Sequence, residues 1–585
     1  MRKNILTIFV TLLTILIVFI SIDYVESEGF NPTDDGVILA QSFRLINGES
    51  PHKDFISIRP VFSGILHSIH FFSPMPLQIS ARWFVIFEFF VYSFLWVFAL
   101  FKVFLHFPEN SKLKYLLISS VFLFSFILNL NNYNLFPWTT IDAIFLSVIG
   151  FSFYNTIFLK KIIWKNSILI ALGLLFFSLS ALSRQSFVVV LFFGFLYTAF
   201  HFFRKKEFLK LVCVATIGIS PIIFYFFVLL KNEAFFLFLN QMTGRTELVE
   251  TGIIQFIKYF IKSKLLVLNV LVIIWFVLFS VNRNIFKNKK KKLLHAKTWI
   301  LGFYFFATLA FSFFHFYQKS NIIYIVPFEF FWILISVFLI AIHTLKLKMN
   351  QIVTIFFVIL LSWTSSISLG DNSPIFAMGL LGVTTIILII YILQKQNNSV
   401  RKIITKKHFP IFIIAVVCSL FVVSIFGQRR ANYRDLPSEK LDYSLGEIFF
   451  EFGEIRTNKN CFDYYSDFIS IYNSMDDIQN NFVMLPNNSA IYPILKSRNP
   501  FPLDWMQHDE YIGAEQLLYE KIEEVLKTKK IYIFIDKHEL KKISQKLEPK
   551  KYDNYLYDYL PLVFENCLEV EIESDFFKVF ISNGF

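Results

Sequence analysis

Long apolar stretches separated by short polar ones fill the first 427 residues of the chain. A helix that crosses a bilayer needs roughly 17 to 25 predominantly apolar residues, so the pattern predicts about thirteen membrane-spanning helices. The first is expected to be a retained anchor, because no small-residue cleavage site follows it. The expected spans lie near residues 4–22, 81–103, 115–130, 138–159, 167–183, 187–203, 208–230, 265–282, 299–316, 322–342, 352–365, 375–394 and 409–427.

Beyond residue 427 the apolar runs become short, which predicts a small folded domain over 428–585 in place of further spans. Alternating and amphipathic patterns in this tail favour a mixed α/β fold. The expected elements are a helix over 515–527 and strands over 482–485, 531–536 and 576–582.

Two connections between spans are long enough to carry structure of their own, residues 23–80 and 231–264. The second contains 252–262, whose apolar and basic positions favour an amphipathic helix lying on the membrane interface. The sequence thus predicts a polytopic α-helical transmembrane domain over 1–427, with two long loops, followed by the tail domain.

Composition agrees with a membrane protein. Only 17% of the residues are charged and 55% are hydrophobic, whereas an average soluble protein is about a quarter charged. These values exclude a soluble enzyme and a disordered scaffold, and four cysteines in 585 residues exclude a disulfide-stapled secreted module. Cys461 and Cys567 lie in the tail and could form a disulfide, whereas Cys213 and Cys418 lie in expected spans.

The net charge of +13 is distributed unevenly and does not indicate nucleic-acid binding. Residues 1–427 contain 37 Lys or Arg against 16 Asp or Glu, while the tail contains 19 against 27. The basic residues cluster in alternate connections, and connections of that kind face the cytoplasm. With the N-terminus also inside, an odd number of spans places the tail on the extracytoplasmic side.

The acidic residues of the transmembrane domain gather in the first long loop, which holds seven of the 16. At its centre, Thr33-Asp34-Asp35-Gly36 sets two carboxylates side by side. Adjacent carboxylates can raise each other's pKa, and one of them could act as a general base. The structural alternative is that Thr33 or Asp34 caps a helix over 36–46, since aspartate commonly begins helices.

The residues after this pair follow a distinctive order. Asp34-Asp35 is followed by the aliphatic stretch 37–40, by Gly48-Glu49-Ser50-Pro51-His52-Lys53-Asp54 and by Ile58-Arg59-Pro60. This order resembles the first extracytoplasmic loop of the GT-C glycosyltransferases, a superfamily that includes the protein O-mannosyltransferases and the aminoarabinose transferase of lipid A. His52 stands where that family commonly has Tyr.

Further segments are similar to later parts of the same family. Asp142 begins a span after a short outer loop, like the family's second acidic residue, although an acid favoured by the helix dipole is the alternative. Arg184 follows a span at an outer face, where it would meet a lipid phosphate or reach the headgroups. Tyr324 lies in a Tyr-x-x-Pro segment after Lys319, and its alternative role is an aromatic belt residue. Segment 483–500 resembles the outer domains of bacterial members.

The resemblance implies an inverting glycosyltransferase in a bacterial inner membrane. It would move a sugar from a polyprenyl-phosphate-linked donor to a cell-envelope glycan, lipid or protein on the extracytoplasmic face. Asp34 would be the base, and Asp35 or Asp142 would orient the acceptor or a divalent ion. A divalent cation such as Mg²⁺ or Mn²⁺ could be involved, and Asp34 and Asp35 would then be its ligands.

The same resemblance assigns cations to the donor. Arg59 and Arg184 would stabilise the leaving phosphate, because a guanidinium keeps its charge and binds phosphate through two N–H groups. Lys53 is a weaker candidate for this role, and Tyr324 would touch the donor headgroup.

Other functions stay open at this point. A membrane transporter would carry midplane polar residues in two related halves, which the sequence does not display. A polysaccharide polymerase or ligase would centre on outer loops rich in Arg and His, whereas an inactive envelope-assembly relative would tolerate the Asp-Asp pair and His52. The intramembrane acids Glu88 and Glu329 either take a direct part or pack between helices.

Overall fold

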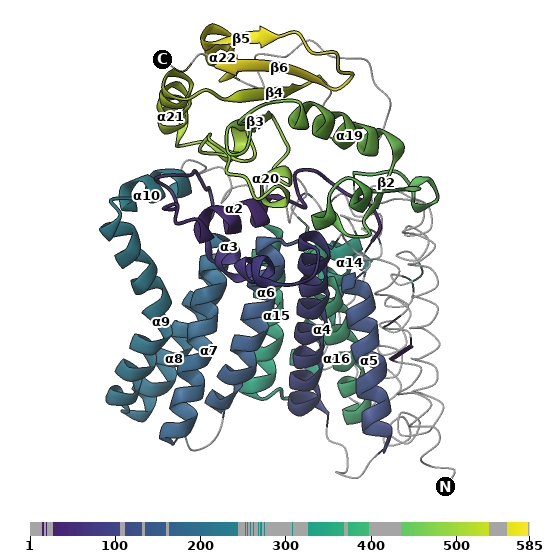
Figure 1. Cartoon of the computed structure of the whole chain (residues 1–585). Coiled ribbons are helices and arrows are strands. Elements are labelled where there is room, and N and C mark those ends of the chain that lie inside the picture. The colour runs from purple at the N-terminus through teal and green to yellow at the C-terminus, as the bar shows by residue number, and fades with distance from the viewer. Residues whose placement is uncertain are drawn as a thin grey trace.

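The computed structural model describes residues 27–105, 112–130, 135–158, 163–243, 326–367, 373–396, 434–537 and 558–582, with a few isolated positions outside them. Long helices form one layer of the molecule, and a smaller domain built on a sheet covers one end of that bundle (Figure 1). Helices of the first loop lie between the bundle and the sheet domain. The arrangement places the acidic loop at a junction of two domains.

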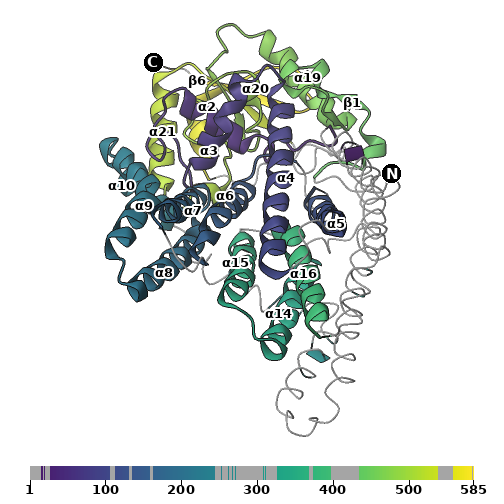
Figure 2. The same cartoon turned by 90° about the horizontal axis from the view of Figure 1, so that it is seen from below.

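The described helices of the bundle coincide with expected spans. They are α4 (Leu77–Phe104), α5 (Lys112–Leu130), α6 (Thr139–Tyr154), α7 (Trp164–Ser183), α8 (Val188–Lys205), α9 (Phe208–Lys231), α14 (Val326–Thr344), α15 (Met349–Ser366) and α16 (Met378–Gln396). All of these except the shorter apolar stretches of α5 and α14 are long and apolar enough to cross a membrane, which gives seven candidate spans among the described residues. Helix α4 packs against α5, α6, α15 and α16, as the view from below shows (Figure 2). The expected spans near 4–22, 265–282, 299–316 and 409–427 lie outside the described residues.

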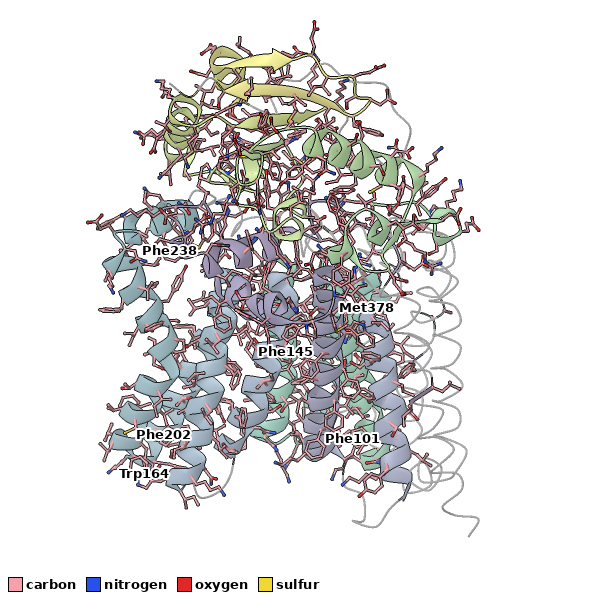
Figure 3. The ribbon with its side chains drawn as sticks, in the orientation of Figure 1. Phe101, Phe145, Trp164, Phe202, Phe238 and Met378 are labelled. Atoms are coloured by element: carbon pink, nitrogen blue, oxygen red, sulfur yellow. The ribbon has the colours of Figure 1, made fainter. Side chains whose placement is uncertain are left out.

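Aromatic side chains fill the bundle and also cover its outside. Inside, the rings of Phe151 and Phe357 stack with centroids 4.3 Å apart. On α8 and α9, by contrast, Phe200 and Phe224 are 60% and 68% exposed, as lipid-facing residues of a membrane helix would be. Figure 3 shows how side chains occupy the whole length of the bundle, with Trp164 at the end farthest from the sheet domain.

Two glycines set the relative position of α6 and α7. A Cβ on Gly150 would lie 2.8 Å from the carbonyl oxygen of Gly173, and a Cβ on Gly173 would lie 2.8 Å from that of Gly150. Small residues at a crossing allow membrane helices to approach closely. This contact fixes how the start of α6, at Thr139, meets the residue that follows α7, Arg184.

The first loop forms α2 (Val37–Ile46), α3 (Phe62–His67) and the 3-10 helix η1 (Ser68–Phe72), which confirms the expected helix over 36–46. The second long loop begins with α10 (Phe235–Thr243). Most of the expected interfacial helix at 252–262 lies outside the described residues.

The tail is a four-stranded sheet in the order β3 (Phe482–Leu485), β4 (Tyr532–Asp536), β6 (Phe577–Ser582) and β5 (Cys567–Val570). Strands β3 and β4 run parallel, and the other pairs are antiparallel. Helix α19 (Lys459–Asn473) packs on one face, while α21 (Glu515–Thr528) and α22 (Leu560–Asn566) pack on the other. The small α/β domain predicted from the sequence is confirmed, with β5 and α19 added.

Short elements connect these parts. They are η2 (Asn155–Phe158), η3 (Gln185–Phe187), η6 (Ile375–Ala377), η7 (Ser438–Lys440), β1 (Tyr443–Ser444), η8 (Leu445–Glu447), η9 (Phe450–Phe452), β2 (Arg456–Thr457), α20 (Ile491–Ile494) and η10 (His508–Glu510). β1 and β2 pair with each other in antiparallel orientation.

The cysteine pairing considered from the sequence is wrong. Cys461 is buried in the cluster on the α19 face of the sheet, whereas Cys567 packs beside the cluster on the opposite face. Both are free thiols. The sheet therefore separates the two side chains, and burial raises the pKa of Cys461, which keeps its thiol protonated.

Candidate functional site

The acidic pair is buried where the first loop meets the tail. Asp34 is 2% exposed and Asp35 is 1% exposed. Asn31 orders the turn, because its side-chain oxygen accepts from the backbone N–H groups of Thr33 and Asp34 at 3.1 and 2.8 Å. Helix α2 begins after Gly36 without any side-chain cap, so the alternative in which Thr33 or Asp34 caps this helix is wrong.

Both carboxylates of this pair meet an arginine. Asp35 Oδ1 accepts from Arg82 Nη2 of α4 at 3.0 Å, and that guanidinium is only 1% exposed. Asp34 Oδ2 accepts from Arg434 Nη1 at 3.0 Å, but this second guanidinium is 40% exposed. Burial raises the pKa of Asp35, while Arg82 acts in the opposite direction. Asp34 is thus the member of the pair whose partner is open to solvent.

The tail lies directly on this turn. Ser489 Oγ donates to Thr33 O at 2.7 Å, and Thr33 Oγ1 donates to Asn487 O at 2.8 Å. A Cβ on Gly36 would lie 2.1 Å from the backbone nitrogen of Ala490, so only glycine permits this approach. The glycine after the acidic pair therefore serves the contact between loop and tail.

A second contact joins α2 to the tail. Arg44 is 4% exposed and donates to both carboxylate oxygens of Asp504, at 2.7 and 2.8 Å. It also donates to Glu49 Oε2 at 2.7 Å and to Phe501 O at 2.6 Å. A bidentate, fully buried pair of this kind fixes orientation as well as position.

Arg59 and Arg184 lie at the start of α6. Arg59 forms a two-bond fork with Glu510 of the tail, both bonds being 3.0 Å, and its guanidinium lies 5.9 Å from the ring centroid of Trp138. Trp138 is the residue before α6, and Thr139 of the next position accepts from Arg184 Nη1 at 3.1 Å. The two predicted phosphate ligands are therefore brought together.

Arg184 is buried, and its hydrogen bonds reach no carboxylate in the described part of the chain. It is 7% exposed, and its hydrogen bonds go to neutral acceptors, Thr139 Oγ1 and Ile367 O. Among the described residues, no carboxylate forms an ion pair with it. Burial, and then the neighbouring charge of Arg59, lower the pKa of Arg184 to about 9, while the nearby carboxylate of Glu510 acts in the opposite direction. Such an environment favours an anionic ligand beside this guanidinium.

The remaining predicted donor ligands are placed differently. Lys53 donates to Asn232 O and Glu233 Oε2, both at 3.1 Å, and so contacts the connection between α9 and α10. Its role in phosphate binding stays a prediction, as does that of Tyr324, which lies outside the described residues. His52 adopts φ 67° and bonds to Gln241 and Tyr225 at 2.8 Å each. Burial lowers the pKa of His52 to about 4, so its ring is neutral and holds the loop in shape.

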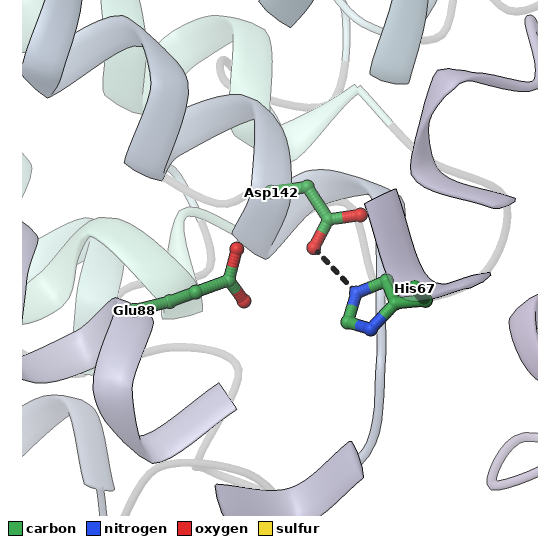
Figure 4. Close-up of side chains that lie close together, drawn as sticks. All are labelled: His67, Glu88 and Asp142. Carbon is green, nitrogen blue, oxygen red and sulfur yellow. Dashed lines mark hydrogen bonds and ion pairs between the residues drawn. The ribbon is translucent and has the colours of Figure 1, made fainter. Parts of the chain in front are cut away.

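Asp142 lies apart from the acidic pair, in a cluster with His67 and Glu88. Asp142 Oδ1 is 3.2 Å from His67 Nε2, and one ligand atom from each of the three residues falls within 4.8 Å of the others. The three come from α6, α3 and α4, and none is exposed (Figure 4). Asp142 and Thr139 occupy the same turn of α6, so this cluster adjoins Arg184.

Several residues of the site could not be found from the sequence. Arg82, Arg434 and Glu510 are separated by 47, 400 and 451 positions from the residues that they pair with. Glu88 gave a signal as an ionisable residue within an expected span, whereas His67 gave none. Their meeting with Asp142 depends on three separate elements.

No family model and no curated protein matches the chain. Among solved structures, the chain is similar to ArnT from Cupriavidus metallidurans bound to undecaprenyl phosphate, with 9% identity over 98% of this chain and 97% of that one, and a TM-score of 0.45. The chain is also similar to the apo state of the same ArnT, with 9% identity over 99% of this chain and 98% of that one, and a TM-score of 0.43. Both alignments cover nearly the full length of each chain at low identity.

Proposed function

We propose that the protein is a membrane glycosyltransferase that moves a sugar from a polyprenyl-phosphate-linked donor to an acceptor. One observation carries the proposal: Arg184 is buried beside Arg59, and its bonds go to neutral acceptors. A site with two guanidinium groups and one carboxylate, Glu510, retains a net positive charge. The phosphate of a lipid-linked sugar supplies the matching negative charge at the end of a membrane helix.

Arg59 and Arg184 would bind the phosphate and stabilise the charge that develops on it as the glycosidic bond breaks. Arg59 is already held in a planar fork by Glu510 and lies against Trp138, so its orientation is set before the ligand arrives. Lys53 would attract the headgroup, because it is 43% exposed and lies toward α10.

Asp34 is proposed as the general base. The acceptor hydroxyl oxygen would form a bond to the anomeric carbon, its proton would pass to the Asp34 carboxylate, and the bond to the phosphate oxygen would break. The phosphate would leave with the electron pair, and attack opposite to it would invert the anomeric configuration. Arg434, being half-exposed, could release Asp34 for this step, whereas Asp35 is held by the buried Arg82.

The reaction would occur on the extracytoplasmic face of a bacterial inner membrane, with a cell-envelope glycan, lipid or protein as acceptor. The basic connections predict that the tail lies on this side. The tail contributes Arg434 and Glu510 to the two sites, and it covers α2 through Arg44 and Asp504. It would therefore complete the site as well as cover it.

The full chain in lipid nanodiscs, given a panel of polyprenyl-phosphate sugars and an extract of native membranes as acceptor, tests the proposal. We expect release of free polyprenyl phosphate, with a drop of about 100-fold or more in Asp34→Asn, in line with loss of a general base. Arg184→Gln should lower the rate by about 100-fold. Lys210→Ala, which removes an ion pair with Glu207 remote from the site, is the matched control and should retain the rate.

Absence of release with every donor, from wild-type protein that unfolds cooperatively on heating, would contradict the proposal. Release that is equal in wild type, Asp34→Asn and Arg184→Gln would contradict the assigned roles. In the first case transport of lipid-linked or free anions becomes the function to test.

A further inference from the structure

Three potential metal ligands converge inside the bundle, at a place separate from the acidic pair. His67 lies at the end of α3, Glu88 in the middle of α4 and Asp142 in the first turn of α6. The exposed fraction of each side chain is 0%. Figure 4 shows the imidazole and the two carboxylates turned toward a common centre. Residues of three elements, distant in sequence, therefore present nitrogen and oxygen ligands to one point.

The cluster lacks partners for most of its oxygens. With both acids ionised, neither carboxylate oxygen of Glu88 has a hydrogen-bond donor among the described residues, and Asp142 Oδ2 has none. The two carboxyl groups lie close enough for a hydrogen bond between them if one of them is protonated. Buried polar atoms are nearly always bonded, and a buried charge without a counter-charge is costly. Two carboxylates facing each other in this way require a cation or a shared proton between them.

A chain of hydrogen bonds fixes the imidazole of His67 from behind. His67 Nδ1 lies 2.9 Å from His70 Nε2, and His70 Nδ1 lies 3.0 Å from Ser80 Oγ. Metal-binding histidines commonly have their other ring nitrogen bonded in this manner, which sets the ring's orientation.

We propose that His67 Nε2, Glu88 and Asp142 bind one divalent transition-metal ion of the zinc class. Ligand atoms around a tetrahedral zinc are about 3.3 Å apart, and the His67 to Asp142 distance of 3.2 Å already has this value. A small shift of the Glu88 side chain closes the remaining gap. An imidazole ligand favours zinc and related ions over magnesium, and three protein ligands leave a fourth position open.

This site differs from the one expected at the acidic pair. Asp34 and Asp35 both face a guanidinium, while the ionised Glu88 carboxylate has no hydrogen-bond donor among the described residues. The ion would lie one helical turn from Thr139, which bonds Arg184. The proposal rests on the cluster itself and does not depend on the transferase function.

Metal content of the full chain tests it directly. Protein purified without chelators, through an affinity tag free of histidine, should carry about one zinc per chain. After the metal is stripped, added Co²⁺ should give visible d–d absorption typical of a four-coordinate site. His67→Ala, Glu88→Gln and Asp142→Asn should lower the affinity for Co²⁺ by at least about tenfold. Glu329→Gln, which alters another fully buried acid of the bundle, is the control and should bind as wild type.

Three results would overturn the proposal. Wild-type protein that neither retains a transition metal nor binds added Zn²⁺ or Co²⁺ would do so. Equal metal content in wild type and all three variants would show that the ion lies elsewhere. If the metal is absent and Glu88→Gln raises the melting temperature, the carboxylates share a proton. Because no sugar donor enters these measurements, their failure is distinguishable from failure of the transferase proposal.

Discussion

The two acidic regions of the molecule are built in opposite ways. Asp34 and Asp35 are neighbours in sequence, yet each has its own arginine, one from α4 and one from the tail. Asp142 and Glu88 are far apart in sequence, yet they face each other beside a histidine. The adjacent acids thus form ion pairs, whereas carboxylate oxygens of the distant acids have no hydrogen-bond partner in the described part of the chain. Proximity in sequence is a poor guide to where a cation is needed.

The largest loss of stability should come from removing the buried guanidinium that pairs with Asp35, in the region of the adjacent acids. Arg82→Ala leaves the Asp35 carboxylate buried without a counter-charge and should lower the free energy of unfolding by about 3 to 5 kcal/mol. Thermal unfolding in nanodiscs measures it. Arg456→Ala, which breaks a pair with Glu28 in which the arginine is 53% exposed, should change stability little. Equal losses of stability in Arg82→Ala and Arg456→Ala would contradict the claim that the buried ion pair matters more than the exposed one.

Removal of a bound metal ion by a chelator should lower stability through the second region, the cluster of His67, Glu88 and Asp142. If an ion occupies the His67 cluster at about 100 times its dissociation constant, its removal should lower the free energy of unfolding by about 2.7 kcal/mol. The melting temperature of wild type should fall on stripping, while that of Asp142→Asn should not. A fall of the same size in the variant would place the stabilising ion elsewhere.

A smaller loss of stability is expected where the tail packs on the acidic pair. Gly36→Ala forces the backbone of Ala490 to move and should cost about 1 to 3 kcal/mol. Limited proteolysis should then release the tail faster than in wild type. Gly64→Ala is the control, since its Cβ would meet only the flexible end of Leu45 at 3.0 Å. Unchanged proteolysis in Gly36→Ala would argue against the docking.

The most gradual effect is a pH dependence of the stability of the second region. The pKa of His70 is about 3 in the folded chain, below the unfolded value of 6.5, so the unfolded state binds more protons between these values. Stability from this group is therefore lost as pH falls below about 6.5, at up to about 1.4 kcal/mol per pH unit. His70→Asn should flatten the dependence. An identical pH profile in this variant would contradict a buried, neutral His70.

Much of the fold could be predicted because apolar run length and strand alternation are local properties. The spans that coincide with α4 to α9 and α14 to α16, and the three predicted strands, follow from them. Strand β5 was missed because its residues are half-buried or exposed and lack a clear alternation. The site was predictable only in part, since Arg59 and Arg184 gave a signal through their position near spans. Their partner Glu510, and the partners of the acidic pair, depend on how distant segments pack.

The binding of a polyprenyl phosphate and of the matching polyprenol, compared in wild type and Arg184→Gln, tests the central claim most directly. The account predicts that wild type binds the phosphate at least about tenfold more tightly than the alcohol, a difference of about 1.4 kcal/mol. Arg184→Gln should remove this preference, and Lys210→Ala should keep it. Equal affinity of wild type for both lipids would contradict a phosphate site at Arg59 and Arg184.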